Sequence, residues 1–545
     1  MVVHTLSPKR IWLIMSGVML SLLLAALDNT IVGTAMPKII HDLHGMAHYA
    51  WPFTSYMLFS TSIIPISGKL ADIYGRKRID LIGLVIFLSA SALCGLSASM
   101  TQLIIFRGLQ GIGGGTLVSS AFIIVGEIFP PRQRGKYTGL VSAMFGVASV
   151  LGPTVGGIIT DSLSWRYVFY VNLPFGFIAF FVLLAVLPPL KHHEGKRRLD
   201  PWGIVTFLLA VFPLLIGFSE GGKEYPWTSP QIVGTFIFSA IMFASFIYVQ
   251  TRSQEPLLSL ALFRSGIFSV SAAGSFLGSA GMFGAVIFIP LFAQSVLGTS
   301  ATSSGFLTAP MMLGLVSATT LGGFLVSRFN RYRPFGLTGF FLAFLGMAAL
   351  ASMGSHVSYG VMAISLFFAG AGIGVTMPIF TMASQNTFPM SQLGVVTSAL
   401  QFFRNMGGTV SSAILGSVML SSMNMKLKAI PTGSLSPQLR TLFRDPKFLG
   451  DHEAMEKVRS SLSHTASSSF DGLIALAKNA LASSIQHVFI ICVCILLTGF
   501  ILTMFLNERR AQKAVEEYHN PVVRAPKLQA EEGAYSQTRE PLAIA

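Results

Sequence analysis

The sequence GKLADIYGRKR at residues 68–78 lies between two long apolar segments, and GFLVSRFNRYR lies between two others at residues 323–333. The first glycines of these stretches, Gly68 and Gly323, are 255 residues apart. Other glycine positions recur in the same order. Gly139 and Gly152 match Gly394 and Gly407, again with an offset of 255 residues. The triplet Gly-Ile-Gly at residues 111–113 matches the same triplet at 372–374, with an offset of 261 residues. Three blocks in one order predict an internal duplication.

The apolar segments around these blocks are long enough to cross a membrane. Hydrophobic residues make up 52% of the chain and charged residues only 11%, whereas soluble domains have about 25% charged residues. A membrane-spanning helix needs about 20 mainly apolar residues. We therefore expect about fourteen spans, with approximate limits 11–36, 50–71, 79–98, 101–126, 138–160, 168–188, 202–219, 231–250, 267–292, 302–326, 335–354, 358–385, 393–420 and 485–506.

The duplication divides these spans into two groups of six. We expect an all-α polytopic membrane protein with an N-terminal six-helix bundle at 1–188 and a C-terminal six-helix bundle at 261–507. Residues 189–260 would form a linker and two inserted spans, 421–484 an outer segment, and 508–545 a cytoplasmic tail. Two facing six-helix bundles are the architecture of carriers that work by alternating access, with the substrate near the midplane.

The formal net charge of +15 reflects membrane topology rather than nucleic-acid binding. If the N-terminus lies inside, all but one of the short inner loops carry Lys or Arg, in clusters such as 76–78, 132–136, 191–198 and 328–333, while the short outer loops have few basic residues. This is the positive-inside bias. It predicts cytoplasmic N- and C-termini. The first span is not a signal peptide, because it is too long and thirteen spans follow it.

Four motifs resemble those of the major facilitator superfamily, and within it the fourteen-span drug:proton antiporter branch. They lie at residues 27–37 (LDNTIVGTAMP), 68–78, 107–115 (RGLQGIGGG) and 146–157 (GVASVLGPTVGG), in order and on the corresponding spans. Trp165-Arg166 followed by Asn172-Leu173-Pro174 is also typical of this branch. The resemblance covers residues 11–507. It implies a proton-coupled antiporter in the cell membrane that exports amphipathic small molecules or drugs.

Asp28 and Arg107 are the candidates for proton coupling. Asp28 lies in the outer part of the first span between apolar neighbours, and a carboxylate within a membrane is costly, so it is a functional candidate by default. Burial favours the neutral acid, which suits a group that takes up a proton outside and releases it inside. Arg107 would modulate its proton affinity directly or through Gln110. For both residues a purely structural hydrogen-bonding role remains the alternative.

The loop motif supplies candidates for gating. Gly75 can adopt positive φ in a tight turn. Asp72 and Arg76 are four residues apart and can pair, and Glu127, at the inner end of the fourth span, is a second partner for Arg76. The resemblance implies that Asp72 and Arg76, in the motif that begins at Gly68, latch the cytoplasmic side in the outward-facing state. The alternative, charge that only sets topology, accounts for the basic residues but not for Asp72.

The fifth span carries a stripe of small residues. Ser142, Gly146, Ser149, Pro153 and Gly156 are spaced four, three, four and three apart, which puts them on one helix face and lets helices approach closely. Pro153 should bend the helix. Together with the motif residues Gly152 and Gly157, the stripe is expected to seal the two halves against ion leak while they rock. Ordinary packing is the alternative.

The second half keeps the packing glycines but not the acids. Gly281 corresponds to Asp28, Phe368 to Arg107 and Ser327 to Asp72, and the spans between 267 and 420 contain no Asp or Glu. We therefore assign proton coupling to the N-terminal half and pocket shape to the C-terminal half. Related exporters of lipophilic cations often carry acids in the later spans, so cationic dyes are not expected here. The candidates for substrate contact are Asn29, Gln110, Gln401, Arg404 and Asn405.

Other classes fit the sequence less well. A dedicated metabolite transporter of the same fold remains possible. A membrane-embedded enzyme would need clustered Asp, Glu, His or Cys at one membrane face, and no such cluster or nucleotide-binding Gly-Lys-Ser/Thr loop is present in the sequence. We expect no enzymatic activity, no metal, no cofactor other than protons, and no nucleic-acid partner. The expected partners are a small-molecule substrate and the lipid bilayer, and the expected state is a monomer.

Overall fold

The computed structural model describes residues 7–43, 51–188, 199–222, 225–299, 301–353, 358–389, 392–428, 464–509 and 512–513. Within these ranges the only pairing of β type is an isolated bridge between Gly221 and Tyr225, so the all-α prediction is confirmed. The helices are α1 (Pro8–Leu43), α2 (Trp51–Tyr74), α3 (Arg76–Leu96), α4 (Met100–Ile128), α5 (Pro131–Ser162), α6 (Tyr167–Tyr170), α7 (Asn172–Val186), α8 (Pro201–Glu220), α9 (Pro230–Arg252), η3 (Leu260–Arg264), α10 (Gly266–Ser295), α11 (Ala301–Phe329), α12 (Arg333–Ala351), α13 (Tyr359–Thr387), α14 (Leu393–Lys428) and α17 (His464–Met504).

Nearly all of the expected spans are long apolar helices. Within the described residues, thirteen are long and apolar enough to cross a membrane, with α6 and α7 together forming one of them. The remaining expected span is α2, whose 24 residues include many Ser and Thr and also Pro65, which lower its hydropathy. Helices α14 and α17 extend beyond the predicted limits at 420 and 485. The outer segment is therefore helical at 421–428 and 464–484, and its residues 429–463 lie outside the described ranges.

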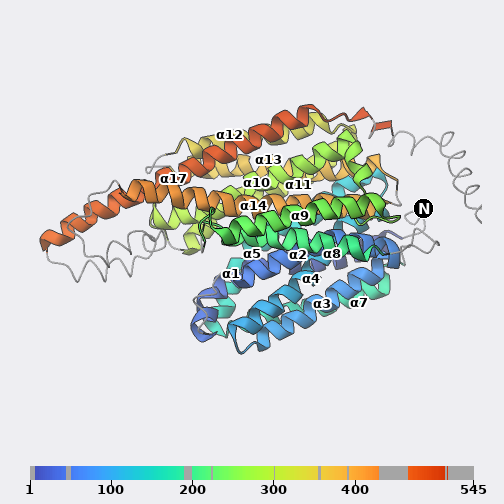
Figure 1. Ribbon diagram of the computed structural model, residues 1–545, viewed down its shortest axis with the longest axis horizontal. Coiled ribbons are helices and arrows are strands. Elements are labelled where there is room, and N and C mark those ends of the chain that lie inside the picture. The colour runs from blue at the N-terminus through green and yellow to red at the C-terminus, as the bar shows by residue number, and fades with distance from the viewer. Residues whose placement is uncertain are drawn as a thin grey trace, which may run out of the picture.

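The two sets of six helices repeat one packing pattern. In the first set α2 packs on α4, α1 on α5, α3 on α4 and α1 on α7. In the second set the corresponding pairs are α11 with α13, α10 with α14, α12 with α13 and α10 with α17. The sets meet through α5 with α11 and α2 with α14, which are again equivalent pairs. Figure 1 shows the sets as lower and upper groups of nearly parallel helices.

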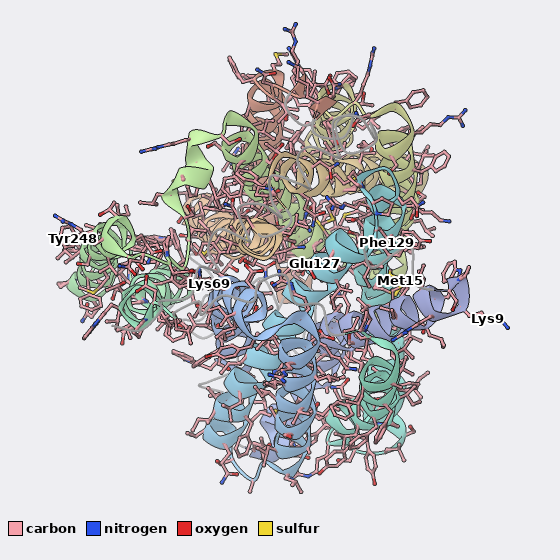
Figure 2. All side chains as sticks on the ribbon, turned by 90° about the vertical axis from the view of Figure 1, so that its right-hand side faces the viewer. Lys9, Met15, Lys69, Glu127, Phe129 and Tyr248 are labelled. Atoms are coloured by element: carbon pink, nitrogen blue, oxygen red, sulfur yellow. The ribbon has the colours of Figure 1, made fainter. Side chains whose placement is uncertain are left out.

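Helices α8 and α9 pack on each other and lie at the side of the two sets, as Figure 2 shows by the position of Tyr248. That view looks onto the end of the molecule that carries Lys9, Lys69, Glu127 and Phe129, which we call the basic end. Arg76, which donates to Glu127, and Arg134, which donates to the Phe129 carbonyl, lie at the same end. Lys69 at this end pairs with Glu255, just after α9, with 2.8 Å between Nζ and Oε2. The limits that we predicted for the domains stay predictions.

The structure corrects one assignment between the halves. On α4, Gly111 and Gly115 pack on α2 while Gly113 packs on α3; on α13 the same alternation is made by Gly370, Gly372 and Gly374 against α11, α12 and α11. The equivalence is therefore Gly111 with Gly370, an offset of 259 rather than 261. The counterpart of Arg107 is the fully buried Leu366 and not Phe368, which is 42% exposed. The sequence comparison matched the Gly-Ile-Gly triplets at 111–113 and 372–374, but the second triplet lies two residues further along its helix than the structural equivalent of the first.

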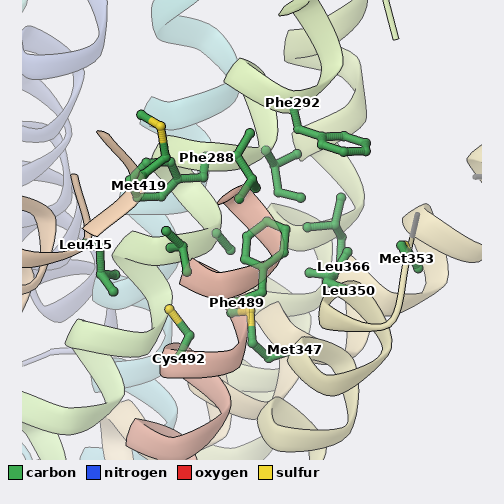
Figure 3. Packing of buried hydrophobic residues seen from close by; sticks show 14 of the residues in the cluster. Phe288, Phe292, Met347, Leu350, Met353, Leu366, Leu415, Met419, Phe489 and Cys492 are labelled. Atoms are coloured by element: carbon green, nitrogen blue, oxygen red, sulfur yellow. The ribbon is translucent and has the colours of Figure 1, made fainter. Parts of the chain in front are cut away.

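The second set contains a large buried cluster that is entirely apolar. Figure 3 shows Phe288 and Phe292 of α10, Met347 and Leu350 of α12, and Phe489 and Cys492 of α17 packed together, and all six are buried. Gly281, the position equivalent to Asp28, faces this region: a Cβ there would lie 2.7 Å from Cδ2 of Leu496 on α17. At Gly281 the second set therefore has a close contact between α10 and α17, where the first set has the polar side chain of Asp28.

Candidate functional site

Asp28 lies at the centre of a hydrogen-bond network inside the first set of helices. Its side chain is fully buried, and Arg107 Nη1 donates to Oδ2 in an ion pair. The other oxygen, Oδ1, accepts from Gln110 Nε2 at 2.8 Å and from Asn172 Nδ2 at 3.1 Å. Ser91 Oγ accepts from the same two amides, at 2.9 Å each. Helices α1, α3, α4 and α7 thus meet at one carboxylate.

The guanidinium of Arg107 has partners on several sides. Its Nη1 also donates to Gln110 Oε1 at 2.8 Å, and Nε donates to the carbonyl of Pro52 at 3.4 Å. The Tyr56 ring lies 4.4 Å from the guanidinium carbon, a cation–π contact. Protonation of Asp28 would cancel the ion pair and leave this cation in place. Binding of a single proton to Asp28 would therefore be able to change the packing of the four helices that the network joins.

A cavity of about 280 Å³ adjoins this network. Asn29, the residue after Asp28, lies on its wall, together with residues of α2, α8 and α14. Ser219 of α8 and Thr54 of α2 are linked across the wall, with 3.1 Å between their hydroxyl oxygens. This cavity, which we call the central cavity, therefore has walls from both sets and from the inserted helices. Its remaining lining residues are Phe53, Met57, Leu58, Leu215, Thr409, Ser412 and Ala413.

A second charged cluster lies at the basic end. Arg76 Nε donates to Glu127 Oε1 at 2.6 Å, Nη2 donates to Asp72 Oδ1, and Nη1 donates to the carbonyl of Gly68 at 3.3 Å. All three charged side chains are at most 4% exposed. Gly75, with φ of 94°, makes the turn between α2 and α3 that brings Arg76 back to Asp72. The structure thus places together the three side chains that the sequence predicted to pair.

This cluster is part of a contact between the two sets. Gly394 of α14 lies against Asp72 and Arg76, and Gly68 lies against Ser398 of α14. On the other side of the basic end, Arg134 Nη1 of α5 donates to Asn386 Oδ1 of α13 at 2.7 Å. Gln385 Nε2 donates to the carbonyl of Phe122 at 3.3 Å. The two sets are therefore joined at the basic end through α2 with α14 and through α13 with α4 and α5.

The small-residue stripe on α5 divides into two parts. Gly146 of the stripe lies against Val316 of α11, so this part contacts the other set. Nearer the start of α5, and outside the stripe, Gly135 approaches the backbone of Gly323 on the same helix. Gly152 and Gly156 lie against Thr30 and Thr34 of α1, in their own set. A Cβ at Gly157 would meet no atom within 4 Å. Helix α5 continues through Pro153.

The expected seal between the halves is therefore wrong for part of the motif. The contact to the other set is made by the first half of α5, whereas Gly152 and Gly156 hold α1. The spacing of the stripe gave the helix face correctly. It could not give the neighbour, because α5 crosses from one partner helix to another along its length.

The polar residues of the second set lie apart from the Asp28 network. Arg404 of α14 is buried, and its Nη2 donates to the Met377 carbonyl and to Thr381 Oγ1, at 3.4 Å each. The Phe122 ring of the first set lies 5.7 Å from its guanidinium carbon. Within the described residues no carboxylate forms an ion pair with Arg404. A polar lining of Ser275, Ser279 and Thr376 shares a small cavity with it.

The other candidates for substrate contact differ in position. Asn29 lines the central cavity, but Gln110 points to Asp28. Gln401 is buried, and its Nε2 has no hydrogen-bond partner within the described part of the chain. Asn405 is half-buried and is not among the residues that line the central cavity.

Sequence reasoning missed three polar residues of this region. Asn172 and Ser91 complete the Asp28 network, and the Asn172-Leu173-Pro174 motif could have pointed to the first of them. Asp80 on α3 is buried, with Oδ2 unpaired within the described residues and a side-chain hydrogen bond to Ser120. It stands directly after the basic run 76–78, at the charged end of the predicted span 79–98.

Comparison with known proteins gives concordant results. The family described as "Major Facilitator Superfamily" matches residues 18–412. The multidrug transporter protein MdtP of Bacillus subtilis is 39% identical over 503 residues, covering 91% of this chain and 93% of that protein. Multidrug resistance protein 3 of the same organism is 35% identical, covering 92% and 96%.

Solved structures share the fold at low identity. A bacterial homolog of the human lysosomal transporter Spinster, in an inward-facing conformation, has a TM-score of 0.57 at 17% identity, covering 92% of this chain and 98% of that one. The human organic anion transporter MFSD10 has a TM-score of 0.57 at 16% identity, covering 90% and 100%.

Proposed function

The chain belongs to the major facilitator superfamily, and on that premise we propose that it is a proton-coupled antiporter that exports amphipathic small molecules by alternating access. The observation that carries the proposal is the Asp28 network. A fully buried carboxylate, held by one cation and two amides, directly precedes Asn29 on the wall of the central cavity. Intramembrane carboxylates of this kind mark proton pathways. The printed names of the two Bacillus subtilis relatives support drugs as the exported class.

In the proposed cycle a proton and a substrate compete through Asp28. With Asp28 charged, Arg107 and the amides of Gln110 and Asn172 fix the four helices around it. Proton uptake from outside breaks the ion pair and allows the helices to repack, which changes the wall of the central cavity. Release of the proton to the inside restores the pair. Export is then driven by the proton gradient, because each return of the empty carrier requires a proton.

We propose that the basic end faces the cytoplasm, as the positive-inside rule predicts, and that the termini lie on that side of the cell membrane. The contacts of Arg76 and Arg134 between the two sets then close the cytoplasmic side. The arrangement fits an outward-facing state, in which the cluster of Asp72, Arg76 and Glu127 acts as the latch. The limits of the two bundles, a monomeric state and the absence of a cofactor belong to the same proposal.

The charge of the second set favours a substrate class. Arg404 is a buried cation without a carboxylate partner in the described residues, and the spans between 267 and 420 contain no acid. A substrate with a negative group would form an ion pair with the Arg404 guanidinium, whereas that guanidinium would repel a lipophilic cation. We therefore propose that neutral, anionic and zwitterionic amphipaths are exported in preference to cationic dyes, with Gln401 and Asn405 beside Arg404 shaping the site.

The test is transport by the purified full-length protein in liposomes under an imposed pH gradient. The panel contains a zwitterionic fluoroquinolone, an uncharged amphipath and the cation ethidium. Wild type should accumulate the first two against their gradients, and Asp28→Asn should abolish accumulation while leaving exchange of labelled for unlabelled substrate. Asp161→Asn, at an exposed carboxylate of α5, is the matched control and should behave as wild type.

Three results would contradict the proposal in different ways. Unchanged uphill accumulation by Asp28→Asn would remove Asp28 from the coupling mechanism. Transport that ignores the pH gradient in wild type would exclude proton coupling. Transport of one polar metabolite and of none of the amphipaths would replace drug export by the dedicated metabolite transporter.

A further inference from the structure

A second cavity is larger than the central one. A groove of about 920 Å³ lies between the inserted helices and the second set. Its walls include Phe218 of α8, Trp227 just before α9, and Phe236 of α9. The other side is formed by Ile414 and Ser417 of α14 and His487 of α17. The volume lies within the range of about 300–1,000 Å³ that is usual for small-molecule sites. We call it the lateral groove.

One wall of the lateral groove is a group of aromatic rings. The Trp227 and Phe236 rings are nearly parallel, with an interplanar angle of 5° and 6.3 Å between centroids. Phe218 meets both edge-on, at 5.1 Å from Phe236 and 6.2 Å from Trp227. Flat aromatic surfaces bind planar ring systems by offset or edge contact. This wall therefore suits the apolar body of a ring-containing ligand.

The opposite wall has hydrogen-bonding groups. Ser417 Oγ accepts from Trp227 Nε1 at 2.5 Å, and Ser422 Oγ lies 2.9 Å from His487 Nδ1. Ser421 also lines the groove. A few polar groups in a mainly apolar site fix the orientation of a ligand. The two walls together therefore suit an amphipathic ligand, with one apolar part and one polar part.

The lateral groove opens toward the membrane. Two of its lining residues are exposed although they lie within the predicted spans: Ile414 by 41% and Ile490 by 48%. Apolar side chains exposed on such helices face lipid. A molecule dissolved in the bilayer can therefore reach the groove without passing through water.

Behind the lateral groove lies the central cavity. On α8, Leu215 and Ser219 face the central cavity, and Phe218 faces the groove. On α14, Ala413 faces the central cavity, and its neighbour Ile414 faces the groove. Successive residues of a helix point about 100° apart, so the two sites lie on adjoining sides of the same two helices. The contact between α8 and α14 is the partition between them.

We propose that the lateral groove is a second binding site for the exported amphipaths, through which they pass between the central cavity and the half of the bilayer away from the basic end. The inference rests on the proposed function and gives the inserted helices a role in it. Parting of α8 from α14 joins the two sites. The aromatic wall binds the ring system of the ligand, and Ser417, Ser422 and His487 bind its polar group.

The test uses a fluoroquinolone carrying a photoreactive diazirine, with full-length protein in liposomes, followed by mass spectrometry of the labelled peptides. Labelling is expected in residues 414–425 and 487–491, with competition by unlabelled fluoroquinolone. Val418→Trp fills the groove and should abolish this labelling and lower the efflux rate. Ile241→Trp, at a 54% exposed position of α9 that lines neither site, is the matched control and should keep both.

A milder variant tests the polar wall. His487→Ala should lower the apparent affinity of groove labelling about fivefold, the effect of one lost hydrogen bond, without changing labelling elsewhere. The inference is overturned if wild type exports the fluoroquinolone but labels only the central cavity. It is also overturned if lipid alone occupies the groove, seen as quenching of Trp227 by brominated lipid that the fluoroquinolone does not relieve. Absence of any gradient-driven export would instead contradict the proposed function.

Discussion

The two sets of six helices pack in the same way and differ in what they bury. In the first set a carboxylate and a guanidinium, Asp28 and Arg107, form a fully buried ion pair. In the second set the equivalent positions are Gly281 and Leu366, packed against apolar neighbours such as Leu496. The duplicated pattern therefore fixes helix contacts and leaves the interior chemistry free. Both sets bury charge, because Arg404 lies in the second, but within the described residues only the first set buries ion pairs.

The largest effect that would test this difference comes from Arg107→Leu, which gives the first set the residue of the second. Asp28 is left as a buried carboxylate without a cation, and breaking a buried pair costs about 3–5 kcal/mol. We expect a large fall in the midpoint of thermal unfolding in detergent. Asp28→Ala combined with Arg107→Leu should recover most of the loss, while uphill transport stays absent. If the double variant is no more stable than the single one, the pair is not the source of the cost.

The reverse change, Gly281→Asp, puts a carboxylate beside the apolar cluster of the second set. An unpaired charge at the centre of a membrane helix costs about 2.5–3.5 kcal/mol on insertion scales, and the new side chain also meets Leu496. We expect lower stability and no new dependence of transport on pH. Gly281→Ala measures the steric part separately. A second proton-dependent step in the aspartate variant would show that the two halves are interchangeable.

At the basic end the difference is tested by Arg76→Ala. Its side chain donates to Asp72, Glu127 and the Gly68 carbonyl, and hydrogen bonds to charged groups contribute about 1.5–3 kcal/mol each. Loss of these bonds should shift the protein toward a state that is open at this end. A cysteine at Ser398, in a Cys494→Ser background, should then react faster with a water-soluble maleimide. Arg78→Ala, at an exposed position, should leave the rate unchanged.

The smallest effects distinguish the two ends of α5, of which the first contacts the other set and the second does not. Gly135→Ala pushes a methyl group against the backbone of Gly323, and overpacking of this kind costs about 1–3 kcal/mol. Gly157→Ala meets nothing within 4 Å and should stay within about 0.5 kcal/mol of wild type. Thermal unfolding and proton leak in empty liposomes measure both. An increased proton leak in the Gly157→Ala variant would show that the seal between the two sets lies at the outer part of the motif after all.

Much of this arrangement was predictable from the sequence, for physical reasons. Hydropathy and charge bias reveal the spans, because lipid requires apolar helices. Asp28, Arg107 and the cluster of Asp72 and Arg76 could be found because ionisable residues in or beside a membrane are rare and costly. Spacing along one helix cannot reveal which helix lies opposite. For that reason the partners of Gly152 and Gly156, and the equivalence of Leu366 with Arg107, required the structure.

Uncharged polar residues and cavities were beyond the sequence for a related reason. Asn172 and Ser91 resemble any polar residue in a span until Asp28 is seen beside them. Asp80 was hidden by its basic neighbours. The lateral groove depends on the angle at which α8 and α9 lie against α14 and α17, which no local pattern specifies.

The ion pair of Lys69 with Glu255 has a consequence for how the two halves find each other. Together with the buried Leu257, Leu258 and Leu262, it docks the connection that follows α9 onto both α2 and α14. Over the described residues 199–222 and 225–264, the tether between the halves is thus largely folded. A folded tether keeps the facing surfaces at a high effective concentration. We therefore expect each closing of the two halves to lose little chain entropy.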